Sequence, residues 1–137
     1  MPTNDGKGGG ADARPPIERG EGKERVYRNR LGERIFASRQ ADGSLKLRDA
    51  QGATTLEKEF AQALLQGIRE AKETGLSASL DRRRNDETED YIQAKIRPGT
   101  NSVDIRQGMG RVARLGQSAR TVFAMRTVER MLSAAFE

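Results

Sequence analysis

The chain has 137 residues, of which 34% are hydrophobic and 33% are charged, so it can build only a modest core. It has no cysteine and no histidine, which excludes disulfides, thiolate metal sites and histidine-based catalysis. No apolar run is long enough to span a membrane and the first residues have no signal-peptide pattern, so we expect a cytoplasmic protein without membrane association.

The formal net charge is +5, and the positive excess is unevenly distributed along the chain. Residues 25–48 contain seven basic and two acidic side chains, and residues 98–137 contain six basic and three acidic ones. Clustered positive charge indicates an anionic partner surface such as nucleic acid.

Residues 1–23 are rich in Gly, Pro, Asp and Lys and contain one large aliphatic residue, Ile17. Such a segment buries too little apolar surface to offset its ordering entropy. We therefore predict a disordered N-terminal tail over residues 1–23 and a single small α+β domain over residues 24–137.

Residues 24–50 have the pattern of an antiparallel β-meander, in which Asp42-Gly43 indicates a two-residue hairpin turn. That turn places Arg39 opposite Lys46. Alternation then gives one apolar face, comprising Phe36, Leu45 and Leu47. The other face carries Ile35, Arg39, Lys46 and Arg48. Its charges either contact an anionic partner or are simply solvated.

The first hairpin of this meander has two possible loops. A two-residue loop at Leu31-Gly32 places Tyr27 opposite Phe36 and adds Arg28 and Arg30 to the basic face. A longer loop with Gly32 in the left-handed region is equally compatible with the sequence. The two loops differ by one residue, and this exchanges the faces of Tyr27 and Arg28.

The next segment predicts a helix over about Thr55–Thr74, with a capping box at Thr54 and Glu57 and a stop at Gly75. Gly67 inside the helix indicates a close approach to the sheet of the meander. One apolar stripe recurs at helical spacing, made of Leu56, Phe60, Ala61, Leu64, Leu65, Ile68 and Ala71. We expect the stripe to pack on the apolar face of the meander, with helix-mediated dimerisation as the alternative.

Two alternating segments, Leu76–Leu80 and Asp90–Arg97, predict strands, and the second directs Ile92, Ala94 and Ile96 inward. The charged residues 81–90 between them predict a long solvated hairpin loop. In residues 100–117 the pattern is weaker. Val103 and Ile105 suit a short strand, and a helical turn is suggested by Met109, Val112 and Leu115.

Residues 118–137 predict a C-terminal helix with Ser118 as its N-cap. Its apolar face is wide, comprising Val122, Phe123, Met125, Val128, Met131, Leu132, Ala135 and Phe136. Such a face either closes the core or meets another protein. We expect Met125, Leu132 and Phe136 to form a self-association surface or to bind a protein partner.

Two short motifs in the sequence bear on chemistry. Gly108–Ala113 matches G-x-G-x-x-A, but too few residues follow it for a dinucleotide-binding βαβ unit. A hinge, or a phosphate-binding turn with Arg111 and Arg114, fits better.

Ile92–Lys95 resembles half of a metal-nuclease site, which needs further carboxylates; Asp86, Glu89 and Asp90 are near in sequence. We predict no catalytic residue, no metal and no cofactor.

The leading hypothesis is a small basic non-catalytic protein that contacts the backbone of DNA or RNA. The alternative is a protein–protein interaction module, such as an assembly, adaptor or inhibitor protein, that uses the C-terminal helix. A small metal-dependent nuclease using Lys95 is the third. The candidate nucleic-acid contacts are Arg28, Arg39, Lys46, Arg48, Lys95, Arg97, Arg111, Arg114 and Arg120.

Overall fold

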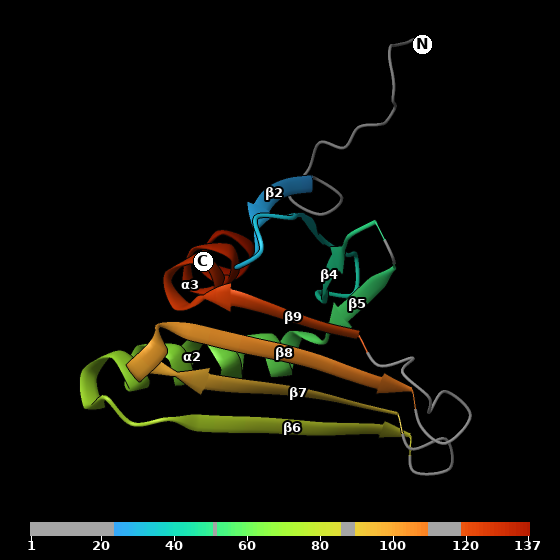
Figure 1. The fold of residues 1–137 in the computed structure, drawn as a ribbon. Coiled ribbons are helices and arrows are strands. Elements are labelled where there is room, and N and C mark those ends of the chain that lie inside the picture. Colours follow the sequence, from blue (N-terminus) through green and yellow to red (C-terminus); the bar gives the residue numbers. More distant parts are fainter. Residues whose placement is uncertain (1–23, 51, 86–89, 110–118) are drawn as a thin grey trace, which may run out of the picture.

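The computed structural model describes residues 24–50, 52–85, 90–109 and 119–137. Within them lie two four-stranded antiparallel sheets and two helices (Figure 1). This arrangement confirms the predicted α+β class. The tail predicted over residues 1–23 lies outside the described residues. Neither described helix is long and apolar enough to cross a membrane.

The first sheet is the predicted meander with one strand added. Its order is β2 (Glu24–Arg28), β3 (Arg34–Arg39), β4 (Leu45–Arg48) and β5 (Ala53–Leu56). The added strand, β5, includes Thr55 and Leu56, which the sequence assigned to the first helix. Pairing with β4 keeps these residues extended, with Leu56 opposite Leu45 and Thr55 opposite Lys46.

Both hairpin loops of the meander contain three residues and end in a left-handed glycine. Asn29 N–H donates to the Glu33 carbonyl at 3.1 Å, with Gly32 at φ 81°, so the longer-loop alternative is confirmed. Gln40 N–H donates to the Ser44 carbonyl at 2.8 Å, with Gly43 at φ 90°. The predicted two-residue turn at Asp42-Gly43 is therefore wrong by one residue.

That single residue changes the faces of β3. Arg39 lies opposite Leu45 rather than Lys46, and Phe36 lies opposite Arg48. Because strand side chains alternate, a one-residue change of register exchanges the two faces. The buried apolar residues on the inner face of the first sheet are Tyr27, Ile35, Ala37, Leu45, Leu47 and Leu56. Phe36 joins the outer face, and Arg39 leaves it.

The second sheet is built from β6 (Ala78–Asn85), β7 (Asp90–Arg97), β8 (Ser102–Met109) and β9 (Ala119–Ala124). The bounds and the inward face predicted for β7 are confirmed. The loop predicted over residues 81–90 is shorter than expected, since β6 continues to Asn85. Backbone pairing with β7 does not require apolar side chains, and Arg82 is held by an ion pair to Glu57 at 3.2 Å.

Residues 119–124 form strand β9, where a helix was predicted. Phe123 pairs with Val103 of β8, and the helix α3 (Met125–Phe136) begins only after Ala124. The sequence Thr121-Val122-Phe123 is β-branched and aromatic, which suits a strand once β8 offers a pairing edge. The helix predicted to start at Ser118 is therefore corrected to a strand followed by a helix.

The helix α2 (Lys58–Thr74) starts later than predicted and stops where predicted. Glu57 is its N-cap and makes no side-chain capping bond, so the capping box at Thr54 and Glu57 is wrong. Gly75 ends it at φ 75°, with its N–H donating to Ala71 at 2.8 Å. The predicted stripe is buried, from Leu56 in β5 through Phe60, Ala61, Leu64, Leu65, Ile68 and Ala71 in α2.

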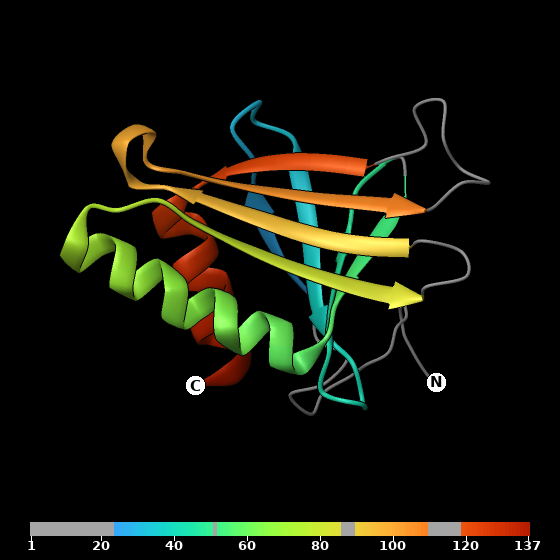
Figure 2. The ribbon, with the colours of Figure 1, turned by 90° about the horizontal axis from the view of Figure 1, so that it is seen from below.

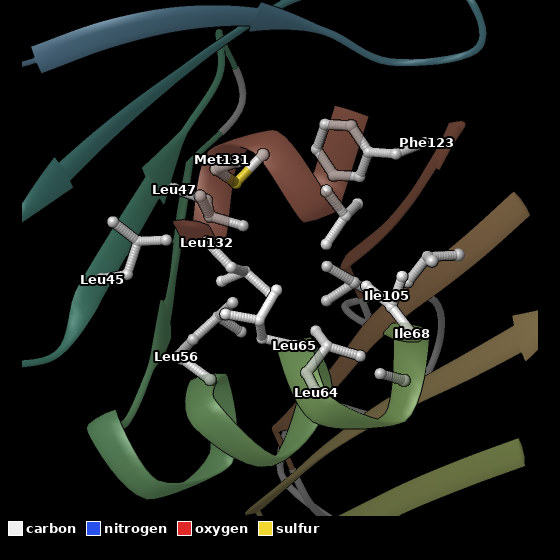
Figure 3. Close-up of a cluster of buried hydrophobic side chains, with 14 of the residues drawn as sticks. Leu45, Leu47, Leu56, Leu64, Leu65, Ile68, Ile105, Phe123, Met131 and Leu132 are labelled. Atoms are coloured by element: carbon white, nitrogen blue, oxygen red, sulfur yellow. The ribbon is translucent and has the colours of Figure 1, made fainter. Parts of the chain in front are cut away.

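The partner of this stripe differs from the prediction. α2 packs chiefly against β6, β7 and α3, as Figure 2 shows, while α3 covers β2 and β3. A Cβ at Gly67 would lie 3.0 Å from Ile96 Cδ1, so the close approach expected there is to the second sheet. One buried cluster includes residues of both sheets and both helices (Figure 3).

The α3 helix closes this core with four buried side chains, Met125, Val128, Met131 and Leu132. Met125 and Leu132 are 4% and 0% exposed, so they are core residues here and are not available as the predicted protein interface. Phe136 is half-buried and packs against the core margin, with the Arg39 guanidinium 4.9 Å from its ring centroid.

Arg30 joins the two sheets at the first hairpin loop. Its backbone N–H donates to the Val122 carbonyl of β9 at 2.7 Å. Its guanidinium donates to the carbonyls of Thr100 and Asn101 at 2.5 and 2.6 Å. Part of the positive charge of the meander therefore serves to hold the two sheets together.

The two helices are also joined by ion pairs, of which the Arg69–Glu137 pair has the clearest consequence. Both of its guanidinium-to-carboxylate distances are 2.7 Å, and Ser133 Oγ donates to the same carboxylate at 3.0 Å. The hydrogen bonds from Arg69, followed by that from Ser133, lower the pKa of Glu137 from 4.5 to about 2.

Arg69→Gln is expected to raise the pKa of Glu137 from about 2 toward 4.5, measured by NMR titration of its carboxyl carbon. A lowered folded-state pKa means that this pair stabilises the fold above pH 4.5, and that the contribution is lost as pH falls toward about 2. Arg126→Gln on the exposed face of α3 is the control and should leave the titration unchanged. A midpoint near 4.5 in the unaltered chain contradicts the pairing.

Candidate functional site

The outer face of the second sheet gathers basic side chains from three strands. Alternation along β7 directs Ile92, Ala94 and Ile96 into the core, which leaves the residues between them outside. Across the sheet, Gln93 pairs with Arg106, and Arg106 pairs with Arg120. The basic side chains on this face that the structure describes are those of Lys95, Arg97, Arg106 and Arg120.

Asp104 lies at the centre of these residues and is only 2% exposed. Arg120 is its closest partner, with Nε 3.0 Å from Oδ1 and a terminal nitrogen 2.8 Å from Oδ2. Arg97 and Arg106 approach the same Oδ2 at 3.4 and 3.6 Å. One buried carboxylate therefore holds three guanidinium groups from β7, β8 and β9. We call Lys95, Arg97, Asp104, Arg106 and Arg120 the Asp104 cluster.

The electrostatics of the cluster follow from this arrangement. Burial by itself raises the pKa of Asp104, but the hydrogen bonds and charge of Arg120, the charge of Arg106 and the hydrogen bond from Arg97 outweigh it and lower that pKa below 3.8. Asp104 in turn raises the pKa of Arg120. Asp104 and Arg120 are therefore both charged at neutral pH.

The cluster retains an excess of positive charge directed at solvent. Its four cations and one carboxylate give a formal charge of +3. The side chains of Arg97, Arg106 and Arg120 are 42%, 36% and 57% exposed, so their outer nitrogens remain accessible. Lys95 lies opposite Asp104 and makes no ion pair with any described residue.

The first sheet has a second group of outward basic residues. Arg28, Lys46 and Arg48, all predicted contacts, share this face with Arg34. Two of them already have partners within the chain. Arg28 donates to the Gly32 carbonyl at 2.6 Å, while Arg48 pairs with Glu24 at 3.1 Å and lies 4.5 Å from the centre of the Phe36 ring.

Arg39, expected to join Lys46 and Arg48, is separated from them by the register. It lies on the inner side of β3, where it donates to the Ala135 carbonyl at 2.7 Å and covers the Phe136 ring. The three-residue loop ending at Gly43 is the cause, because it turns Arg39 toward α3. The predicted Arg39–Lys46–Arg48 cluster is therefore wrong.

Arg111 and Arg114 lie outside the described residues, as does most of the G-x-G-x-x-A segment. Its first glycine, Gly108, is described and lies within β8 opposite Tyr91. A Cβ there would collide with the Tyr91 ring, which explains the glycine by cross-strand packing. Neither the hinge nor the phosphate-binding turn is tested by the described residues.

The residues of the suggested metal nuclease do not come together in the described part of the chain. Gln93 donates to Asp81 at 2.7 Å, and the oxygens of Asp104, which faces Lys95, are taken by arginines. No group of acidic residues able to hold a metal occurs among the described side chains. Asp86 and Glu89 lie outside them, as does the side chain of Asp90.

Sequence reasoning missed Asp104, Arg106 and Arg34. In β8 the buried Val103 and Ile105 alternate with polar residues, and extending the predicted strand by one residue would have placed Asp104 and Arg106 on one face. The spacing of Met109, Val112 and Leu115 suggested a helical turn instead, although the glycines in this segment weaken that pattern. The proximity of Arg120 required knowledge of β9, which no local pattern supplied.

The chain matches no protein-family model, no curated protein and no solved structure. The candidate site is thus defined by its own geometry. It is an exposed sheet face on which three arginines surround a buried carboxylate and a lysine lies beside them.

Proposed function

We propose that this chain is a small, basic, non-catalytic protein that binds the phosphate backbone of nucleic acid through the outer face of β7, β8 and β9. The observation that supports this most strongly is the Asp104 cluster. Its guanidinium groups are drawn to one carboxylate and still leave a formal excess of +3 on an exposed face.

The cluster suits phosphate for two physical reasons. Guanidinium is a planar fork of donors that matches phosphate oxygens, and it is less strongly hydrated than an ammonium group. Asp104 also relieves the mutual repulsion of Arg97, Arg106 and Arg120 and fixes their orientation before a ligand arrives. Pre-ordered side chains lose less conformational entropy on binding than mobile ones.

The second sheet is favoured over the first for related reasons. On the first sheet, Arg28 and Arg48 are engaged by Gly32 and Glu24, and Arg39 is turned inward. The strands β7 and β8 each have eight residues, against four to six in the strands of the first sheet. The longer sheet offers an extended charged surface.

Lys95→Gln combined with Arg106→Gln is expected to weaken binding to every nucleic-acid sequence by a similar factor. Each lost phosphate contact lowers the slope of log affinity against log salt by roughly 0.7–0.9, so two should lower it by roughly 1.5. Arg106 makes the loosest contact to Asp104, at 3.6 Å, so its loss should spare the fold. Fluorescence anisotropy of a labelled mixed-sequence oligonucleotide over a salt series gives both quantities.

The matched control is Arg34→Gln combined with Lys46→Gln, which removes the same charge from the outer face of the first sheet. It should leave the salt slope close to that of the unaltered chain. If the control pair reduces the slope and the test pair does not, the site is on the first sheet. Absence of binding by the unaltered chain at low salt would disprove the proposed function altogether.

The alternative of a protein-interaction module has weaker support. Two of its three predicted contacts, Met125 and Leu132, are buried in the chain's own core. Phe136 alone keeps partial exposure, at the margin beside Arg39. The C-terminal helix therefore presents no continuous apolar face through these residues.

A further inference from the structure

Tyr91 lies on the same outer face as the Asp104 cluster and rests on a glycine. It is paired with Gly108 across β7 and β8. A Cβ built on Gly108 would lie 2.8 Å from Tyr91 Cδ1 and closer still to Cε1 and Cζ. The ring therefore occupies the space directly over the Gly108 backbone, and only glycine permits this position.

This position leaves an aromatic surface at the edge of the charged face. The ring covers the Gly108 backbone on the outer side of the sheet, and Tyr91 keeps part of its surface exposed. Residues two positions apart on one strand face lie about 7 Å apart. Gln93 and then Lys95 follow Tyr91 on β7, and Arg106 lies two residues from Gly108 on β8.

We propose that the ligand of this face is single-stranded nucleic acid, with one base stacked on Tyr91 and neighbouring phosphates held by Lys95, Arg106 and Arg120. This inference rests on the proposed function and specifies its substrate class. The combination of an aromatic ring and adjacent cations on a sheet is the arrangement that the chemistry of single strands requires.

The preference for single strands follows from which part of a base is accessible. In a duplex the base faces are stacked on one another and only their edges are open in the grooves. In a single strand the faces can leave the stack and rest on an aromatic ring, whatever the sequence. Gln93 lies between Tyr91 and Lys95; its amide nitrogen donates to Asp81 at 2.7 Å, and its amide oxygen can accept a hydrogen bond from a base edge.

The test compares three probes with the intact chain: a mixed-sequence DNA single strand of about 12 nucleotides, the same sequence as a duplex, and a base-free deoxyribose-phosphate strand of equal length. The single strand should bind most tightly. Tyr91→Leu should weaken its binding about 5- to 100-fold and weaken the base-free strand far less. Tyr91→Phe, which keeps the ring, should retain most of the affinity.

Phe36→Leu is the matched control, because it removes a half-buried ring from the outer face of the first sheet. It should leave single-strand affinity unchanged.

A measurement on the unaltered chain avoids any dependence on variant folding. The ring protons of Tyr91 should shift by NMR on adding the single strand but not the base-free strand, while those of the buried Tyr27 stay in place.

The outcomes separate this inference from the proposed function. Equal affinity for all three probes, or unchanged Tyr91 ring signals, overturns the single-strand inference and leaves backbone binding standing. Tighter binding of the duplex than of the single strand also overturns the single-strand inference and leaves backbone binding standing. If no probe binds at low salt, both are wrong.

Discussion

Phe123→Ala is expected to lower the free energy of unfolding by about 3–5 kcal/mol. Phe123 is 0% exposed and pairs with Val103 on the inner face of the second sheet, near the start of α3. Removing the ring leaves a cavity between the sheet and the helix that rigid neighbours cannot fill. Urea unfolding followed by circular dichroism measures the change.

The adjacent residue supplies the control for this prediction. Val122 lies on the opposite face of β9 and is only partly buried, so Val122→Ala should lower the free energy of unfolding by about 1 kcal/mol or less. A large contrast between neighbouring residues is the signature of a strand. Similar effects at the two positions would indicate that this segment does not form β9. Phe123→Leu, which leaves a smaller cavity, covers the case in which the alanine variant does not fold.

Asp104→Ala is expected to lower the free energy of unfolding by about 1.5–3 kcal/mol, the range for hydrogen bonds to charged groups. The carboxylate accepts hydrogen bonds from Arg120 at 2.8–3.1 Å and a longer one from Arg97 at 3.4 Å. The effect should stay below that of breaking a fully buried pair, because the released guanidinium groups are partly exposed and can be hydrated.

The difference between the unaltered chain and Asp104→Ala should also depend on pH. The pKa of Asp104 is lowered from 3.8 in the folded state, so its stabilising contribution is present above pH 3.8 and is lost as pH falls through the lower folded value. The free energies of unfolding of the unaltered chain and of Asp104→Ala should differ clearly at about pH 6 and only slightly at about pH 2.

Asp81→Ala is the control for the Asp104 variant, since Asp81 is an exposed aspartate on the same sheet that bonds only to Gln93 among the described residues. Its effect should be about 0.5 kcal/mol or less. The role given to the buried carboxylate is contradicted if the difference in free energy of unfolding between the unaltered chain and Asp104→Ala is the same at both pH values. It is also contradicted if the Asp81 variant is as destabilised as the Asp104 variant.

Local patterns by themselves determined several elements of this protein. The three- and four-residue spacing from Phe60 to Ala71 indicated the buried stripe of α2, and Gly75 marked its end. Alternation from Ile92 to Ile96 indicated β7 and its inner face. These signals suffice because helix periodicity, strand alternation and glycine's access to positive φ depend on the residue and its immediate neighbours.

Other features were decided only by residues distant in the chain. Residues 119–124 have an apolar pattern compatible with a helix, but pairing with β8 makes them a strand. The faces of β3 depend on one extra loop residue before Gly43, which the Asp-Gly pair does not specify.

The candidate site belongs to this second group. Arg97, Arg106 and Arg120 come from three strands, and each is an ordinary surface cation in its own segment. They meet because the register of β7, β8 and β9 brings them around Asp104, which is buried by that same pairing. Sheet registers join residues far apart in sequence and are selected by the burial of the opposite face, so no local pattern could reveal this cluster.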